Sequence, residues 1–309
     1  MPTLPGPMLI SIIVPSFNQN QFIERTLDSI LGQDYRPIEI IICDGASTDG
    51  TVETLRRYAS LHAELRWISE PDKGPADAVN KGLAMALGEI AAIQSSDDIY
   101  YPGAFETVAE IFQREADCGF IIGDYCGIND RDEVLYTETI PAFSWEAYFA
   151  RSLCIPQSSI FFRTALGREL NGWNAKYYSC DLDFWLRMLL RTRALHAGRV
   201  LSGWRLYKGQ RTHAEGANAG IWNGYWQMME DSEDLRAASP RIRRLASASR
   251  HLLALRHHPT SNPWIVRGHL LLGLLQYPTF WARYPWELSR WVPGVVRARR
   301  LYSRWRGLI

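Results

Sequence analysis

The first third of the chain alternates between two hydrophobic patterns. Some segments are apolar without interruption, which is typical of strands buried on both faces, and the segments between them place apolar residues at helical spacing. An alternation of this kind predicts right-handed βαβ units and an α/β fold with a mostly parallel sheet. The predicted strands are residues 9–17, 38–44, 65–69 and 89–94, and the predicted helices are residues 22–31, 51–60 and 75–87.

Polar side chains gather where the predicted strands end. In parallel sheets the carboxyl ends of the strands share one edge, and ligands bind beyond that edge. The pattern therefore predicts a site in the first half of the chain. Asn18 is also expected to cap the helix that follows it. The polar residues are Ser16 and Asn18, Asp44, residues 70–73, and Asp97 with Asp98.

The pattern changes after residue 115. Residues 118–128, 133–140 and 157–163 are predicted strands, and a helix is expected from about Asp181. We expect this half to pack on the first half and to cover its open edge. Residues 1–215 would then form one catalytic domain with halves 1–115 and 116–215, followed by a helical extension over 216–309.

Composition excludes several classes of protein. The chain of 309 residues is 47% hydrophobic with a net charge of +1, so it can bury a large core and gives no general case for nucleic-acid binding. Its five cysteines are scattered without a Cys-x-x-Cys pair, which argues against a disulfide framework or zinc cluster and favours a reducing cytosol. The first ten residues have no basic region before an apolar core, and no run of eighteen apolar residues occurs, so we expect neither a secretory signal nor a membrane span.

The adjacent carboxylates Asp97 and Asp98 follow a buried strand. Mg²⁺ prefers carboxylate oxygens and typically takes one or two from the protein, with phosphates completing its shell. The alternative is a solvated turn before Pro102. The position beside three other polar strand ends favours a metal site.

Three other acids each allow two interpretations. Asp44 is either an ordinary turn residue or the acceptor of a hydrogen bond from a base or ribose. Asp181 and Asp183 either stabilise the start of a helix through its dipole or provide a general base. Physical chemistry alone leaves Asp44 undecided and slightly favours the helix-dipole interpretation for the other two.

Five segments, taken together, resemble glycosyltransferase family 2 enzymes of the GT-A fold. They occur in the family's order over residues 9–190. The resemblance implies an inverting enzyme with a Rossmann-like sheet, a nucleotide-diphosphate-sugar donor (usually a uridine one) and Mn²⁺ or Mg²⁺. The segments are SIIVPSFNQ, IEIIICDGASTDGT, EPDKGPADAVNKGL, GEIAAIQSSDD and DLDFWLRM.

The resemblance also implies roles for individual residues. Asp181 matches the catalytic base, with Asp183 as second choice, although Cys180 stands where the family carries an acid. Asp98 matches the direct metal ligand, and Asp97 would lie nearer the ribose or donor sugar. Tyr207 stands about where the family often has a histidine, for which His213 is an alternative. The other donor-binding matches are Pro15, Ser16, Asn18, Asp44 (base reading), Asp72, Lys73 and Asp77.

Residues 262–309 differ from the rest of the chain. They carry eight arginines, one acid and nine aromatic residues, five of which are tryptophan. They either pack on the catalytic domain or form amphipathic helices on an anionic membrane, and the composition favours the membrane. The enzyme would then lie peripherally on the inner face of the cytoplasmic membrane. There it would meet a glycan or lipid-linked acceptor in bacterial surface-polysaccharide assembly. A protein-binding surface would have the same composition.

Two rival functions remain. A sugar nucleotidyltransferase also uses a sheet and metal-binding acids, but it usually has a glycine-rich basic loop where this chain has PSFNQNQF. The same loop lacks G-x-G-x-x-G, which argues against a nicotinamide enzyme. A catalytically degenerate transferase that acts as a membrane scaffold is the non-enzymatic alternative.

Overall fold

The computed structural model describes most of the chain up to residue 257. The described residues are 6–141, 143–149, 156–210 and 217–257, together with 268–269, 271–273, 275 and 277. Internal contacts divide the chain into two compact units. The first comprises Met1–Phe143 and Cys154–Ile221, and the second comprises Ser144–Leu153 and Trp222–Ile309.

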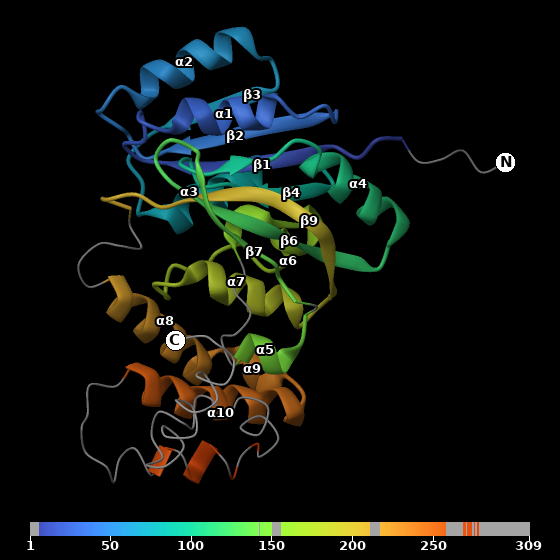
Figure 1. Cartoon of the computed structure of the whole chain (residues 1–309), viewed down its shortest axis with the longest axis vertical. Coiled ribbons are helices and arrows are strands. Elements are labelled where there is room, and N and C mark those ends of the chain that lie inside the picture. Colours follow the sequence, from blue (N-terminus) through green and yellow to red (C-terminus); the bar gives the residue numbers. More distant parts are fainter. Residues whose placement is uncertain are drawn as a thin grey trace, which may run out of the picture. The chain divides into compact units, whose positions relative to one another are not determined.

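Helices and strands alternate through the first unit (Figure 1). Its elements are β1 (Ile10–Ser16), α1 (Ile23–Leu31), β2 (Ile38–Asp44), α2 (Thr51–Leu61), β3 (Leu65–Ser69), α3 (Pro75–Met85), β4 (Ile90–Ile93), β5 (Ile99–Tyr100), α4 (Ala104–Arg114), β6 (Cys118–Ile128), β7 (Val134–Glu138), the 3₁₀ turn η1 (Gln157–Ser159), β8 (Ile160–Arg163), α6 (Thr164–Glu169), α7 (Cys180–Leu189) and β9 (Arg193–Arg205).

All the strands of the first unit belong to one sheet. Its order is β3-β2-β1-β4-β8-β6-β9-β5, with β7 paired to β6. The predicted parallel half is confirmed, because β1 pairs in parallel with β2 and β4, and β2 with β3. The second half packs on the first, as expected, and it does so by extending the sheet. β8 pairs antiparallel with β4, on the side of β4 that β1 leaves open, and also with β6.

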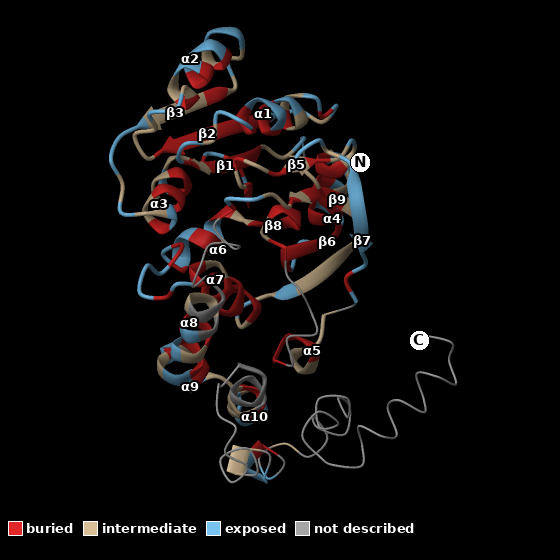
Figure 2. Cartoon of the chain, turned by 60° about the vertical axis from the view of Figure 1, so that its left-hand side comes forward, coloured by how far each residue is buried: buried red, intermediate tan, exposed pale blue. Residues whose placement is uncertain are grey.

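Side-chain alternation in the strands builds a core on each face of the sheet. Ile10, Ile12 and Val14 of β1 pack with the buried faces of α1, α2 and α4. On the other face, Ile13 lies where any side chain larger than glycine at Gly82 of α3 would collide with it. Figure 2 shows the buried strands between the helices and β7 exposed along its length.

Two strands and one helix start differ from the sequence-based predictions. β5 and β9 were not predicted, and β9 is the longest strand, at 13 residues. Asn18 does not cap α1. That helix begins at Ile23 with Phe22 at its N-cap, and Asn18 has a left-handed φ of 52° in the loop before it.

The second unit is helical where it is described. The helix α8 (Ala217–Asp231) begins in the first unit and continues in the second, which also contains α5 (Trp145–Phe149), α9 (Glu233–Ala237) and α10 (Pro240–His257). The short helix α5 packs against α10, and Ser249 donates a 2.5 Å hydrogen bond to the carbonyl of Phe149. Most of residues 262–309 lie outside the described residues. Among the described residues, no helix is both long and apolar enough to span a bilayer.

Candidate active site

The carboxyl ends of three parallel strands lie level with one another. Ser16, the last residue of β1, is in register with Asp44 of β2, and Asp44 is in register with Ser69 of β3. Pro15 precedes Ser16 within β1. The hydroxyl of Ser16 is buried and has no hydrogen-bond partner among the residues that the structure describes. The predicted polar strand ends therefore do share one edge.

Two neighbouring loops at this edge are joined by hydrogen bonds. The side chain of Asn18 accepts a 2.9 Å bond from the backbone N–H of Thr48, and the Asn18 N–H donates to the Ser47 hydroxyl at 2.7 Å. Asn20 extends the link, since its N–H donates to Asp49 at 2.9 Å. The segment after β2 thus fixes the shape of the turn after β1, and Asn18 serves this loop whatever else it binds.

Asp44 is buried at the centre of these loops. Its Oδ2 accepts bonds from the Ser47 N–H at 2.9 Å and the Ser69 hydroxyl at 2.7 Å. Its Oδ1 accepts from the Ser47 hydroxyl. The carboxylate, which is only 2% exposed, therefore organises the loops at this edge of the sheet.

The loop after β3 contributes the next three predicted residues. Asp72 accepts a 2.8 Å bond from the Gly74 N–H, and its other oxygen lies close to Gly45. The side chain of Lys73 is exposed. Asp77, in the first turn of α3, accepts from the Lys73 N–H and forms an ion pair with Lys81 at 3.2 Å. The Lys73 N–H and the Lys81 ammonium hold the pKa of Asp77 below its usual value.

The side chains of Asp97 and Asp98 lie in different environments, one half-buried and the other fully buried. Asp98 is only 2% exposed, and its Oδ1 accepts a 2.8 Å bond from the backbone N–H of Arg205. Asp97 is half-buried, and its Oδ2 accepts a 3.0 Å bond from the hydroxyl of Tyr207. Asp98 thus joins β4 to β9 in the interior, while Asp97 is the carboxylate nearer the surface.

Burial raises the pKa of both carboxyl groups. For Asp98 the pKa lies well above the usual range, first because of burial and second because of the Asp97 charge. For Asp97 burial outweighs the Tyr207 hydrogen bond and the Arg205 charge. Two neighbouring acids that resist ionisation favour a nearby cation.

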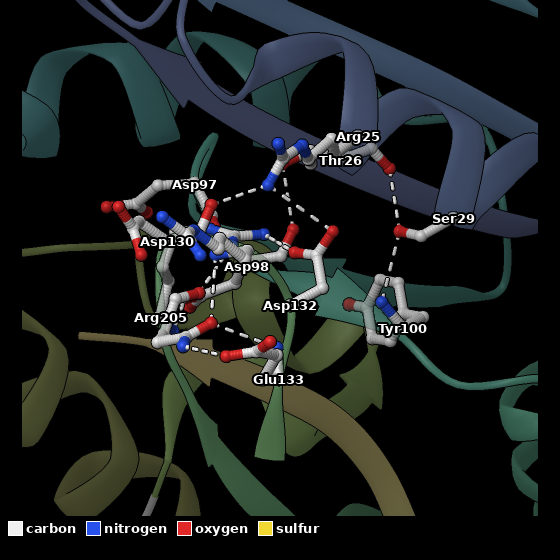
Figure 3. A network of polar contacts seen from close by, with 12 residues as sticks. Arg25, Thr26, Ser29, Asp97, Asp98, Tyr100, Asp130, Asp132, Glu133 and Arg205 are labelled. Atoms are coloured by element: carbon white, nitrogen blue, oxygen red, sulfur yellow. Dashed lines mark hydrogen bonds and ion pairs between the residues drawn. The ribbon is translucent and has the colours of Figure 1, made fainter. Parts of the chain in front are cut away.

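Arg205 holds this part of the site together (Figure 3). Its side chain is fully buried. It donates to the carbonyls of Asp97 at 2.6 Å and Asn129 at 2.8 Å, and it forms an ion pair with Asp132. Arg25 of α1 pairs with Asp132 at 3.4 Å. The turn between β6 and β7 is therefore fixed to both α1 and the double aspartate.

Aromatic packing places Tyr207 beside the same network. The ring of Phe22 lies 4.6 Å from the ring of Tyr207, and the Arg205 guanidinium lies 4.7 Å from the Phe22 ring. Burial, followed by the nearby Asp97 charge, raises the pKa of Tyr207 to about 12, so its hydroxyl stays protonated at neutral pH. His213, the alternative to Tyr207, lies outside the described residues.

The helix α7 brings Asp181 to the same edge of the sheet. It packs on β6 and leads within three residues into β9, which is parallel to β6. A helix connected this tightly runs antiparallel to the strand that follows, so its first turn lies at the carboxyl ends of the strands. Asp181, in that turn, is half-exposed.

Asp183, the second choice for the base, is an ion-pair residue. It is 2% exposed, and its Oδ2 accepts bonds from Arg187 at 2.8 and 2.7 Å. Arg187 also donates to the carbonyls of Leu170 and Gly172. This buried pair secures α7 to the preceding loop.

Sequence reasoning missed Phe17 and the structural role of Arg205. Phe17 is 60% exposed at the end of β1, and its ring lies beside Gly45 and Asp72. A large exposed aromatic residue directly between Ser16 and Asn18 was a readable signal. The role of Arg205 was not readable, because its partners lie 73 to 108 residues away in the sequence.

The residues around Asp97 suit a hard divalent cation. The Asp97 carboxylate presents the oxygen donors that Mg²⁺ and Mn²⁺ prefer, and the buried acid Asp98 lies next to it in the chain. No three His, Cys, Asp or Glu side chains cluster as a complete metal site in the described part of the chain. A cation here would therefore need phosphate oxygens from a ligand.

Comparison with known proteins agrees with this architecture. The model of the family "Glycosyl transferase family 2" matches residues 11–168. Chondroitin synthase of Escherichia coli is 28% identical over 190 residues, which cover 60% of this chain and 27% of that protein. GlyG of Streptococcus pneumoniae is 34% identical over 129 residues, covering 41% and 42%. The matches to these two relatives thus span less than half of each.

Solved structures show the same fold. S. aureus TarS 1-349 in complex with UDP-GlcNAc superposes with a TM-score of 0.66 at 16% identity, covering 95% of this chain and 88% of that one. The mannosyltransferase PcManGT from Pyrobaculum calidifontis, in complex with GDP-Man and Mn²⁺, gives a TM-score of 0.61 at 22% identity, covering 88% and 76%. With its GT-A sheet and matching family segments, the chain belongs to glycosyl transferase family 2.

Proposed function

We propose that this chain transfers a sugar from a nucleotide-diphosphate sugar, most simply a UDP-sugar, to a hydroxyl of a glycan or lipid-linked acceptor. The observation that carries the proposal is that the loop after β4, which contains Asp97, leaves the sheet at the same edge as Asp44 and Phe17. Related structures with UDP-GlcNAc and with GDP-Man and Mn²⁺ support a nucleotide-sugar donor.

The nucleotide would bind over the ends of β1, β2 and β3. Phe17 offers an exposed ring for stacking on the base, and stacking of this kind is worth about 1–3 kcal/mol. The buried carboxylate of Asp44 holds the loops that would surround the base, and the Ser16 hydroxyl at the same edge has no hydrogen-bond partner among the described residues. Asp72 lies beside Phe17 and Gly45. The exposed ammonium group of Lys73, in the same loop, would bind a phosphate of the donor.

We assign the metal to Asp97 in preference to Asp98. The oxygens of Asp98 are buried, and one of them accepts the Arg205 N–H, whereas Asp97 is the more exposed and has the Tyr207 hydroxyl beside it. A divalent cation bound there would act as a Lewis acid toward the departing diphosphate. Asp98 would then support Asp97 by fixing β4 against β9.

Asp181 is the proposed general base. Its carboxylate would take the proton of the acceptor hydroxyl, and the acceptor oxygen would form a bond to the anomeric carbon. The bond from that carbon to the β-phosphate oxygen breaks, and the nucleoside diphosphate leaves with inversion. We prefer Asp181 to Asp183, because the Asp183 carboxylate is bonded to Arg187.

The acceptor and location are proposed from the relatives and from composition. TuaG of Bacillus subtilis, a putative teichuronic acid biosynthesis glycosyltransferase, is 36% identical over 118 residues, which supports a role in bacterial surface polysaccharide assembly. The arginine- and tryptophan-rich residues 262–309 support peripheral attachment to the inner face of the cytoplasmic membrane.

Ligand-dependent stabilisation tests the donor class. The unfolding temperature would be measured with UDP, dTDP and GDP, each with Mn²⁺ and with EDTA. A nucleotide at 100 times its Kd adds about 2.7 kcal/mol to the free energy of unfolding. A metal-dependent rise with one nucleotide is expected. No rise with any of them would contradict the proposed donor site, and a rise without turnover of any donor sugar would favour a degenerate transferase.

A further inference from the structure

The helix α10, in the second unit, carries positive charge that the sugar-transfer site does not use. Its sequence, residues 240–257, contains five arginines and no acid. Arg241 pairs with Glu146 at 2.6 Å, and Arg250 pairs with Glu230 at 3.1 Å. These two arginines therefore help to hold the helices of the unit together.

Arg243 and Arg244 are in a different situation. Both are exposed, and neither has a carboxylate partner among the residues that the structure describes. With Pro240 and Ser247 they recur at helical spacing on one face of α10, and all four line a hollow that is open to solvent. The N–H groups of the first turn add a partial positive charge at the same end of the helix.

The opposite face of α10 is already covered by protein. Leu245, Ala246 and Ala248 are buried, and Ser249 donates its hydroxyl to the carbonyl of Phe149 in α5. Over residues 240–250, where the side chains are described, the apolar positions are therefore covered and the exposed face presents positive charge. Such a face favours a partner that carries negative charge.

We propose that this face of α10 binds the phosphate headgroups of an anionic lipid bilayer. A bilayer fits better than a soluble phosphate, because positive charge continues into the later part of the same unit. Residues 262–309 add eight arginines against one acid, together with five tryptophans, a composition suited to a lipid interface. The inference concerns a surface outside the sugar-transfer site and does not depend on the donor or the acceptor.

Vesicle binding of the full chain tests the proposal. Vesicles of phosphatidylglycerol with phosphatidylcholine would be compared with vesicles of phosphatidylcholine alone. Each basic residue near an anionic surface contributes about fivefold to partitioning, so Arg243→Gln with Arg244→Gln should weaken binding to the anionic vesicles by about 30-fold. Raising the salt concentration to 1 M should weaken wild-type binding, because it shortens the screening length to about 3 Å.

A matched control removes the same charge elsewhere. Arg56 and Arg131 are exposed in the first unit, and Arg56→Gln with Arg131→Gln should leave vesicle binding within about twofold of wild type. The variant Arg243→Lys with Arg244→Lys should retain binding, since it keeps both charges. Equal denaturant midpoints for all variants would show that the lost binding does not reflect unfolding.

Three results would overturn the inference. The first is wild-type protein that does not prefer anionic vesicles. The second is an Arg243/Arg244 glutamine variant that binds them as the control variant does. The third is an Arg243/Arg244 glutamine variant that keeps vesicle binding but no longer binds inorganic phosphate or a single-stranded RNA. That result would assign the face to phosphate or RNA and not to a bilayer.

Discussion

Asp181 and Asp183 are two residues apart, yet the structure gives them different environments. Asp183 is buried and holds Arg187 with two hydrogen bonds, while Asp181 is half-exposed at the start of α7. Both acids suit a helix N-terminus, and sequence reasoning did not separate them. Arg187 was a readable signal, because it lies four residues after Asp183 on the predicted helix. The burial of this pair depends on tertiary structure.

Replacement of each acid should therefore have a different effect. Asp183→Asn leaves Arg187 buried without its counter-charge and should lower the free energy of unfolding by about 3–5 kcal/mol. Asp181→Asn should change stability by less than about 1 kcal/mol and abolish transfer while preserving donor binding. Urea unfolding, donor titration and a transfer assay measure the three quantities. Normal transfer by Asp181→Asn would rule out Asp181 as the base.

Phe17 offers a second test at the residue scale. Because stacking on a base is worth about 1–3 kcal/mol, Phe17→Ala should weaken binding of the nucleoside diphosphate by roughly 5- to 150-fold. Phe17→Tyr keeps the ring and should bind within about threefold of wild type. Calorimetric titration gives both Kd values, and an unchanged Kd for Phe17→Ala would show that the base binds elsewhere.

At the scale of elements, one arginine joins three parts of the fold. Arg205 ends β9 and contacts the loop after β4 and the turn between β6 and β7. These contacts explain why the two aspartates are held apart, with Asp98 bonded inward and Asp97 bonded to Tyr207. No local sequence pattern encodes them, since the Arg205 N–H bond to Asp98 spans 107 residues.

Loss of this arginine should destabilise the first unit. Arg205→Met leaves the carbonyls of Asp97 and Asn129 without their donor and should lower the free energy of unfolding by about 3 kcal/mol. Arg199→Met removes an exposed arginine from the same strand and should cost less than about 1 kcal/mol. Guanidinium unfolding of the two variants measures both losses in the free energy of unfolding. Equal losses would show that Arg205 stabilises the fold no more than an exposed arginine does.

Glu39, near the start of β2, makes a pH-dependent contribution to stability. Burial alone would raise its pKa, but hydrogen bonds from Ser11, the Leu87 N–H and Arg66 outweigh burial and hold it below the usual value. The folded state therefore favours the ionised form. This stabilisation is present above the unfolded pKa of about 4.3 and is lost as pH falls through the lower folded pKa.

Glu39→Gln should remove that dependence. Its free energy of unfolding should be lower than that of wild type at pH 7, and the gap should narrow as the pH falls from about 5 to about 3. Urea unfolding at pH 7, 5, 4 and 3 measures the gap. A gap that stays constant over this range would mean that the Glu39 carboxylate contributes no linked stability.

At the scale of the whole molecule, the sequence predicted the parallel half of the sheet well. Strands buried on both faces leave continuous apolar runs, and β1, β2 and β3 were readable for that reason. β9 was missed because RALHAGRVLSGWR mixes polar and small residues, and its pairing with β6 shifts register several times. Residues 144–153 belong to the second unit, although most of that unit lies about 70 or more residues later in the chain. No local sequence pattern predicts such a long-range association.

For the candidate site as well, some features were readable from the sequence and others were not. The sequence located Ser16, Asp44, Asp97 and Asp98 at strand ends, because turn position follows directly from strand prediction. It could not decide which aspartate faces a ligand, since that depends on Arg205 and Tyr207 of the distant β9 region. The assignment of the metal to Asp97 is therefore a proposal that depends on tertiary structure.

The assignment of the cation to Asp97 can be tested by calorimetric titration of UDP, or of whichever nucleotide stabilises the protein. Wild type, Asp97→Asn and a control, Asp34→Asn, would each be titrated with Mn²⁺ and with EDTA; Asp34 is exposed in the loop before β2 and outside the candidate site. We expect Mn²⁺ to strengthen binding to wild type and to Asp34→Asn, and we expect Asp97→Asn to lose this gain while remaining folded. A full Mn²⁺-dependent gain in Asp97→Asn would contradict the assignment of the cation to Asp97.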